Sequence, residues 1–308
     1  MPLYEHQKKT LAFMYTRYTQ YQYGAILALS MGLGKTLCSL VMFRHMLKEG
    51  IASSVLIVIP PTLYPDWVKE IKKVFKEEPV IYRSGRKARP IGLINLVSYD
   101  MLKNKQVQEQ LNKLDKYILI CDEAHKYISK TTNGRYKAVS TLKPVTTFLL
   151  TGTPIYNRLE NLYGLVSLVA PDLAGTKKQW QDNYLVLKDR WLKRKPFRYA
   201  PDCKCPYGKK IPQGHTYFKC GECGQNYVKD TYVAGYRQEN LGALKKKLST
   251  VLIRIKTEEC NDLPEKRVHY VPYQLKDTKL KYEAALANME SSSQIHELLR
   301  ILSGSTIV

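Results

Sequence analysis

The stretch Leu29-Ser30-Met31-Gly32-Leu33-Gly34-Lys35-Thr36 decides the fold of this chain. An apolar run over residues 24–29 leads into it, and a helix-like stretch over residues 37–47 follows it. The order strand, glycine-containing loop, helix is the context that a phosphate-binding loop requires. The sequence therefore predicts an α/β nucleotide-binding lobe with a central, mostly parallel sheet.

The residue types of this loop suit a triphosphate. Gly32 and Gly34 lack side chains, so backbone N–H groups can close around phosphate oxygens, and the dipole of the following helix favours negative charge at the same place. Lys35 would reach the β- and γ-phosphates, and the Thr36 hydroxyl would ligate Mg²⁺. One departure is Leu29, which stands where this pattern usually has glycine or another small residue. We assign ATP contact to the whole loop, namely Met31, Gly32, Leu33, Gly34, Lys35 and Thr36.

A second motif, which is acidic, follows an apolar run over residues 117–121. A carboxylate at such a strand end can hold Mg²⁺, and the next one can deprotonate the attacking water. We therefore assign Asp122 to the metal, Glu123 to general base catalysis, and His125 to linking nucleotide state with other parts. The alternative is a helix N-terminus whose acidic residues are favoured by the dipole.

The composition points to a polyanionic partner. The 308 residues carry 49 Lys and Arg against 27 Asp and Glu, a formal charge of +22. Such an excess is typical of nucleic-acid-binding proteins. No stretch is apolar enough to span a membrane, and the N-terminus lacks a secretory signal pattern. We expect a cytoplasmic protein, or one in a host cytoplasm if the chain is viral, with DNA as partner, no membrane partner and a monomeric state.

Other strand ends offer further candidates. Apolar runs over residues 54–59, 94–97 and 148–150 predict buried strands of a parallel sheet, at whose carboxyl ends ligands bind. Thr62, Ser98 and Tyr99 follow two of these runs and could contact a DNA backbone, although core or cap roles for Ser98 and Tyr99 are equally open. Thr151, Gly152 and Thr153 follow the third run and could couple the γ-phosphate pocket to the nucleic-acid face. Gln7, in a helical pattern near the N-terminus, could read adenine through its amide or be a surface residue.

Composition changes after residue 170. Residues 188–219 are rich in Lys, Arg, Pro and Tyr, and two close cysteine pairs lie in or beside them: Cys203 with Cys205, and Cys220 with Cys223. Four thiolates suit tetrahedral structural Zn²⁺, and His215 could replace one of them. We predict a basic, zinc-ribbon-like insertion over 171–240. The lobe would then comprise 1–170 and be completed by 241–275, with a helical linker over 276–308.

Together these motifs resemble the Swi/Snf family of DNA-dependent ATPases within helicase superfamily two. The matching stretches are L-Y-E-H-Q, M-G-L-G-K-T, L-I-V-I-P-P-T-L, L-V-S-Y, L-I-C-D-E-A-H-K, L-L-T-G-T-P-I-Y-N-R-L-E-N-L and V-L-I-R-I-K-T-E-E-C-N-D-L-P-E-K. The resemblance implies a RecA-like lobe that binds ATP with Mg²⁺ and tracks along duplex or branched DNA. It assigns the adenine to Gln7, hydrolysis to Lys35, Asp122 and Glu123, and the DNA backbone to Thr62, Ser98 and Tyr99.

Three departures from the family qualify that expectation. The family usually has Asp-Glu where Leu29 and Ser30 stand, and the cysteine insertion is not a general family feature. Nothing after residue 275 offers an arginine finger or the second half of an ATP cleft, so we expect this chain alone to hydrolyse ATP poorly. The compact length and the insertion suggest a phage or viral member.

Two other functions stay open at this point. One is a nucleotide-gated DNA-binding module without motor activity, and the other is a strand-separating helicase on single-stranded DNA or RNA.

Overall fold

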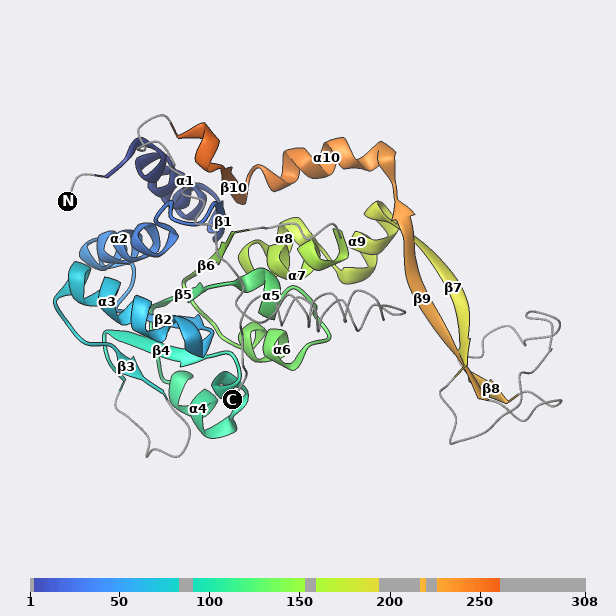
Figure 1. Cartoon of the computed structure of the whole chain (residues 1–308), viewed down its shortest axis with the longest axis horizontal. Coiled ribbons are helices and arrows are strands. Elements are labelled where there is room, and N and C mark those ends of the chain that lie inside the picture. Colours follow the sequence, from blue (N-terminus) through green and yellow to red (C-terminus); the bar gives the residue numbers. More distant parts are fainter. Residues whose placement is uncertain (1–2, 83–90, 153–158, 194–216, 220–225, 261–308) are drawn as a thin grey trace, which may run out of the picture. The chain divides into compact units, whose positions relative to one another are not determined.

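A seven-stranded parallel sheet is the larger of the two sheets in the computed structural model (Figure 1). The structure describes residues 3–82, 91–152, 159–193, 217–219 and 226–260. The strand order is β10-β1-β6-β5-β2-β4-β3, and every adjacent pair is parallel. The bounds are β1 Ala25–Leu29, β2 Ser54–Ile59, β3 Val80–Ile81, β4 Ile94–Ser98, β5 Tyr117–Cys121, β6 Thr146–Thr151 and β10 Leu252–Ile255. This sheet confirms the predicted α/β, RecA-like fold.

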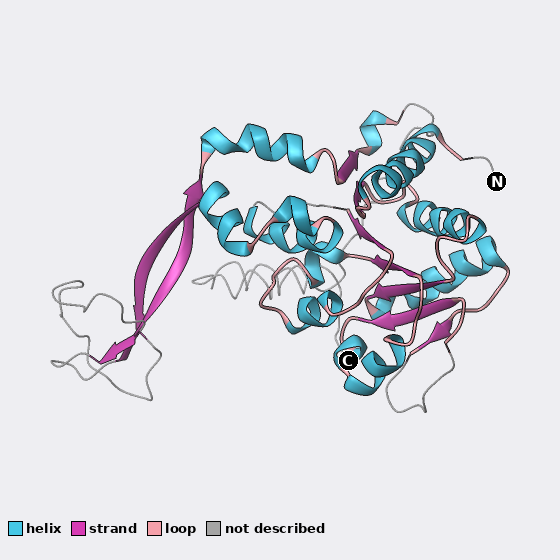
Figure 2. Cartoon of the chain, turned by 180° about the vertical axis from the view of Figure 1, so that it is seen from behind, coloured by secondary structure: helices cyan, strands magenta, loops and turns pink. Residues whose placement is uncertain are grey.

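The central strands are apolar because helices cover both faces of the sheet (Figure 2). Every residue of β1, β2, β4, β5 and β6 is buried, which is why apolar residues predominate in these strands. Leu119 and Leu149 pack into one core cluster with Leu162 and Val166 of α7 (Leu159–Val169).

The helices and short helical turns connect these strands. The longer helices are α1 Glu5–Tyr21, α2 Lys35–Lys48, α3 Tyr64–Phe75, α7, α9 Lys177–Tyr184 and α10 Gln238–Leu248. The shorter ones are α4 Lys105–Leu111, α5 Ala124–Tyr127, α6 Gly134–Ser140 and α8 Pro171–Ala174, with turns η1 Pro61–Leu63, η2 Met101–Lys103 and η3 Thr257–Glu259.

The segment after α7 forms part of the core and then a separate small sheet. Ala174, Trp180 and Tyr184 are buried members of the core cluster. The antiparallel sheet has the order β7-β9-β8, with bounds β7 Leu185–Lys193, β8 Tyr217–Lys219 and β9 Asn226–Tyr236. The chain then returns through α10 to β10, which pairs with β1. The domain limits at 170, 240 and 275 stay predictions.

Two findings concern the described residues alone. None of their helices is long and apolar enough to cross a membrane. Within these residues no group of three or more His, Cys, Asp and Glu side chains could hold a metal. The predicted zinc ligands Cys203, Cys205, Cys220 and Cys223 lie outside the described part of the chain.

Candidate active site

The phosphate-binding loop joins β1 to α2 in the conformation that its glycines allow. Gly32 and Gly34 have φ of +83° and +79°, in the left-handed region where side chains are unfavourable. Gly34 caps α2, whose first residue is Lys35. Leu33 is buried and anchors the loop, whereas Met31 is 81% exposed at its tip. The predicted strand, loop and helix are therefore all present.

Helix α1 packs its first turn against this loop. The amide of Gln7 is buried, and a Cβ at Gly34 would lie only 2.6 Å from Gln7 Nε2. Gln7 Oε1 accepts the backbone N–H of Tyr4 (3.2 Å), which fixes the amide at the helix start. The neighbouring His6 places Nε2 3.1 Å from the carbonyl of Leu33. Gln7 is therefore not a surface residue, and His6 is a loop contact that the sequence analysis missed.

Lys35 and the two carboxylates share one electrostatic environment. Lys35 Nζ donates to the carbonyls of Leu29 (2.7 Å) and Ser30 (3.2 Å), so the ammonium lies against the loop. Burial lowers the pKa of Lys35, while the negative charges of Asp122 and Glu123 act in the opposite direction. In turn, the positive charge of Lys35 acts to lower the pKa of Asp122. The loop after β1 and the motif after β5, two strands separated only by β6, thus lie close enough for their charges to interact.

Asp122 is held from several sides. Trp67 of α3 donates its indole N–H to Oδ2 (2.9 Å), and the backbone N–H of Glu123 donates to Oδ1 (2.8 Å). Burial raises the pKa of Asp122, and these two hydrogen bonds oppose that rise because they favour the charged form. Trp67 is buried at 1% exposure. The sequence analysis did not include Trp67 among the site residues, so its contact with Asp122 is a finding of the structure.

The peptide between Asp122 and Glu123 is fixed at both ends. The hydroxyl of Tyr99 donates to the carbonyl of Asp122 (2.7 Å), and the N–H of this peptide binds the Asp122 side chain. Glu123 itself has φ of +50°, a left-handed conformation that costs a non-glycine residue roughly 1–2 kcal/mol. Glu123 Oε2 lies 3.1 Å from Lys126 Nζ and 3.8 Å from His125 Nδ1. The predicted general base is therefore held in a strained, defined position.

His125 connects this motif to the neighbouring strand. Its Nδ1 lies 2.6 Å from the hydroxyl of Thr151, the last residue of β6. Strand β6 lies between β1 and β5 in the sheet, so Thr151 stands between the loop and the acidic motif. Gly152 follows directly, and Thr153 lies outside the described residues. The geometry brings together His125 and Thr151, two residues of the predicted coupling set.

The predicted DNA contacts differ in their surroundings. Thr62 is exposed in η1, after the carboxyl end of β2. Tyr99 is instead 1% exposed, with its hydroxyl bonded to Asp122, and Ser98 Oγ accepts the N–H of Met101 (3.1 Å). These bonds give Tyr99 a core role and Ser98 a cap role, the alternatives that the sequence left open. Contact of either side chain with DNA stays a prediction.

Comparison with known proteins agrees with this geometry. The SNF2-related domain matches residues 6–306. The chain belongs to the SNF2-related domain family. Among curated proteins, it is 34% identical over 164 residues to the Uncharacterized ATP-dependent helicase YqhH of Bacillus subtilis, covering 53% of this chain and 29% of YqhH. It is 30% identical over 197 residues to the DNA repair and recombination protein RAD54B of Gallus gallus, covering 58% and 21%. This SNF2-related chain thus spans less than a third of either relative.

Solved structures share the fold. The Sulfolobus solfataricus SWI2/SNF2 ATPase core in complex with dsDNA matches with a TM-score of 0.62 and 22% identity, over 98% of this chain and 58% of that one. The SWI2/SNF2 ATPase core domain of the same organism matches with a TM-score of 0.60 and 21% identity, over 98% and 57%. At this identity the likeness shows the fold alone.

The residues present fit ATP with Mg²⁺. Lys35 is a partly buried cation and Asp122 a buried anion, and burial disfavours the charged form of each. A phosphate would bring a further negative charge to Lys35, and a divalent cation would bring a further positive charge to Asp122. Thr36 directly follows Lys35 at the start of α2 and is the hydroxyl ligand expected for Mg²⁺.

Proposed function

We propose that this chain is the ATP-binding motor lobe of a DNA-dependent ATPase that moves along or remodels duplex or branched DNA. The observation that carries the proposal is the convergence of Lys35 with Asp122 and Glu123 at the carboxyl edge of a RecA-like sheet. Membership of the SNF2-related family and the basic composition support DNA as the partner.

Each residue has a defined task in this proposal. Mg²⁺ bound with ATP would neutralise charge on the phosphates. Lys35 Nζ and the loop N–H groups would hold the phosphate oxygens, Thr36 and Asp122 would hold the metal, and Gln7 would meet the adenine. The Glu123 carboxylate accepts the proton of the attacking water. His125 and Thr151, with Gly152 and Thr153, relay the state of the site to the DNA-binding face, where Thr62 contacts a phosphate.

The deciding experiment is an ATPase assay on the full-length protein with duplex, forked, junction and single-stranded DNA. We expect stimulation by duplex or branched DNA, and Glu123→Gln to retain ATP binding while turnover falls by at least about 10³-fold, which is the scale of losing a catalytic group. Stimulation by single strands only would favour a strand-separating helicase. DNA binding that depends on nucleotide without any turnover would favour a nucleotide-gated module.

We also propose that the insertion holds one structural Zn²⁺ through Cys203, Cys205, Cys220 and Cys223. The ends of β8 and β9 support this, because Lys219 pairs with Asn226 and the segment with the second cysteine pair joins them. Two cysteines at C-x-x-C spacing are common ligands of structural zinc.

Metal analysis of the purified full-length protein tests the zinc site. We expect one Zn²⁺ per chain, which Cys220→Ser with Cys223→Ser removes and Cys38→Ser does not, because Cys38 is buried in α2. An unchanged metal content in the double variant would contradict the site.

A further inference from the structure

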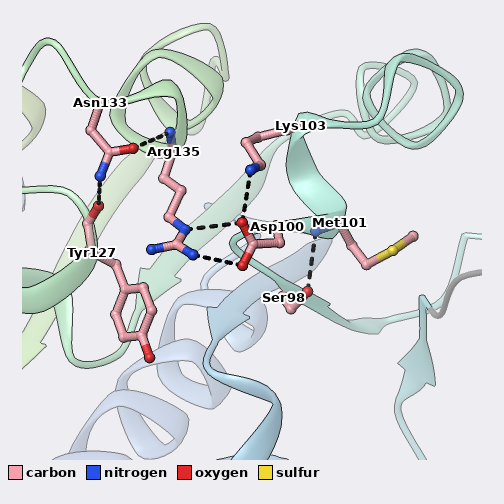
Figure 3. Close-up of polar contacts among 7 residues, drawn as sticks. All are labelled: Ser98, Asp100, Met101, Lys103, Tyr127, Asn133 and Arg135. Carbon is pink, nitrogen blue, oxygen red and sulfur yellow. Dashed lines mark hydrogen bonds and ion pairs between the residues drawn. The ribbon is translucent and has the colours of Figure 1, made fainter. Parts of the chain in front are cut away.

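An ion cluster lies on the surface beside the carboxyl end of β4 (Figure 3). Arg135 of α6 binds Asp100 through two hydrogen bonds, Nε to Oδ1 (3.1 Å) and Nη2 to Oδ2 (2.8 Å). Lys103 of η2 places Nζ 2.8 Å from the same Oδ1. Two cations thus share one carboxylate, and the cluster of Asp100, Lys103 and Arg135 carries a net positive charge.

The cluster retains hydrogen-bond donors for a further anion. A guanidinium has five N–H donors, of which Asp100 takes two, and the Lys103 ammonium has three. Both cationic side chains are partly exposed, at 32% for Arg135 and 47% for Lys103. Since β4 pairs with β2 in parallel, the cluster lies at the same sheet edge as Thr62. A planar guanidinium beside an ammonium suits phosphate oxygens.

A stack of side chains leads from the cluster into the core. The Arg135 guanidinium lies over the ring of Tyr127, 5.1 Å from its centroid. Tyr127 in turn stacks on Tyr99, with centroids 4.7 Å apart and planes 3° from parallel. The hydroxyl of Tyr99 then donates to the carbonyl of Asp122 (2.7 Å). Tyr99 is buried and has little free space around it, so a movement of its ring would also move its hydroxyl and change that hydrogen bond.

The end of this stack is the peptide that precedes the general base. The Tyr99 bond and the N–H bond to the Asp122 side chain hold the Asp122–Glu123 peptide, and Glu123 has a left-handed backbone that few side chains adopt. Backbone strain of this kind is concentrated at active sites and switch regions, so this peptide is a place where a small shift can act on catalysis.

We propose that Arg135 and Lys103 form a DNA-phosphate contact that is coupled to the ATP site through Tyr127 and Tyr99. A phosphate that competes with Asp100 for Arg135 shifts the stack, and the shift reaches the Asp122–Glu123 peptide. DNA engagement thereby changes the position of Glu123. This inference rests on the function proposed above.

A purely structural ion cluster would have different consequences. It would tie α6 to the turn after β4, and its loss would lower stability without changing DNA affinity or its salt dependence. Three variants separate the two cases. Arg135→Ala removes a cation, Asp100→Asn removes the carboxylate, and Tyr127→Leu removes the stacked ring.

The phosphate contact is tested on the full-length protein by fluorescence anisotropy with duplex DNA over a range of salt. We expect Arg135→Ala to weaken binding about tenfold, the size of one hydrogen bond to a charged group, and to lower the salt slope by about 1. Lys137→Ala removes the same charge from an exposed position of α6 and should stay within about twofold. Asp100→Asn should strengthen binding because both cations lose their competing anion.

The coupling is tested by ATPase activity with and without duplex DNA. We expect Tyr127→Leu to lower the ratio of DNA-stimulated to basal turnover, both measured at saturating DNA, roughly threefold or more. Tyr127→Phe keeps the ring and should match wild type.

Two outcomes would overturn the inference alone, while wild-type stimulation stays intact. One is that Arg135→Ala equals Lys137→Ala while Asp100→Asn gives no gain in affinity. The other is full DNA stimulation in Tyr127→Leu. A wild-type protein that DNA does not stimulate would instead overturn the proposed function, and this inference with it.

Discussion

At the scale of single residues, the buried carboxylate of Asp122 depends on one indole. Trp67 is the only described side chain of another element that donates to this carboxylate. Trp67→Phe keeps an aromatic ring but removes the donor, so we expect Mg²⁺-dependent ATP affinity to fall about tenfold. Trp180→Phe is a matched control, since Trp180 is buried and its N–H has no hydrogen-bond partner among the described residues. Equal affinities of the two variants, measured by calorimetry, would contradict this role.

The pKa of His125 gives a pH dependence. Burial lowers this pKa below its ordinary value of 6.5, with Lys126 acting in the same direction and Glu123 against it. The unfolded chain therefore binds a proton more readily, so the free energy of unfolding should decrease as pH falls below about 6.5. Thermal unfolding between pH 8 and pH 5 measures this, and His125→Asn should flatten the curve. An unchanged pH profile in the variant would exclude His125 as the cause.

Motif residues could be predicted at this scale, whereas their supports could not. Lys35 and Asp122 are recognisable because each follows an apolar run in a fixed pattern that phosphate and metal chemistry requires. Trp67 reaches Asp122 across 55 residues and His6 reaches Leu33 across 27. No local pattern encodes such distances, although His6 adjoins Gln7 in a motif already identified.

At the scale of elements, the conformation of the phosphate loop is set by its second glycine. Gly34→Ala requires a left-handed alanine, and its Cβ would lie 2.6 Å from Gln7 Nε2. Gly50→Ala requires a left-handed alanine with nothing within 4 Å of the Cβ. We expect both variants to lose roughly 1–2 kcal/mol of stability, and Gly34→Ala alone to lose ATP affinity. Urea unfolding with ATP titration checks this, and equal ATP affinity in both variants would speak against the Gln7 contact.

The buried strands could be predicted because helices cover both faces of the sheet, which makes apolar residues predominate in them. The long antiparallel pair of β7 and β9 could not be predicted from the sequence. This antiparallel pair leaves side chains open to solvent, and Leu187 and Tyr232 are each about a third or more exposed. Its sequence therefore lacks a clear apolar alternation, and composition indicated only a basic insertion.

At the scale of the whole molecule, the order of the strands in the sheet brings the residues of the candidate site together. The nucleotide loop and the acidic motif follow β1 and β5, which are separated only by β6, and β6 carries the Thr151 partner of His125. Strand β10 closes the other side of β1, where the Ser30 N–H binds the carbonyl of Ile255 (3.0 Å). Residues more than 200 positions apart thus support one loop, an arrangement that the family resemblance implied and that local patterns alone did not.

The most direct measurement is a double-mutant cycle on Mg²⁺-dependent ATP binding by the full-length protein, with Lys35→Ala, Asp122→Asn and the pair. We expect each single variant to weaken binding by about tenfold or more. The combined loss should be clearly smaller than the sum of the two free-energy losses, because both side chains serve one ligand. Lys48→Ala, an exposed cation at the end of α2, should bind like wild type. Unchanged affinity in Lys35→Ala, or fully additive losses in the pair, would contradict a shared triphosphate site.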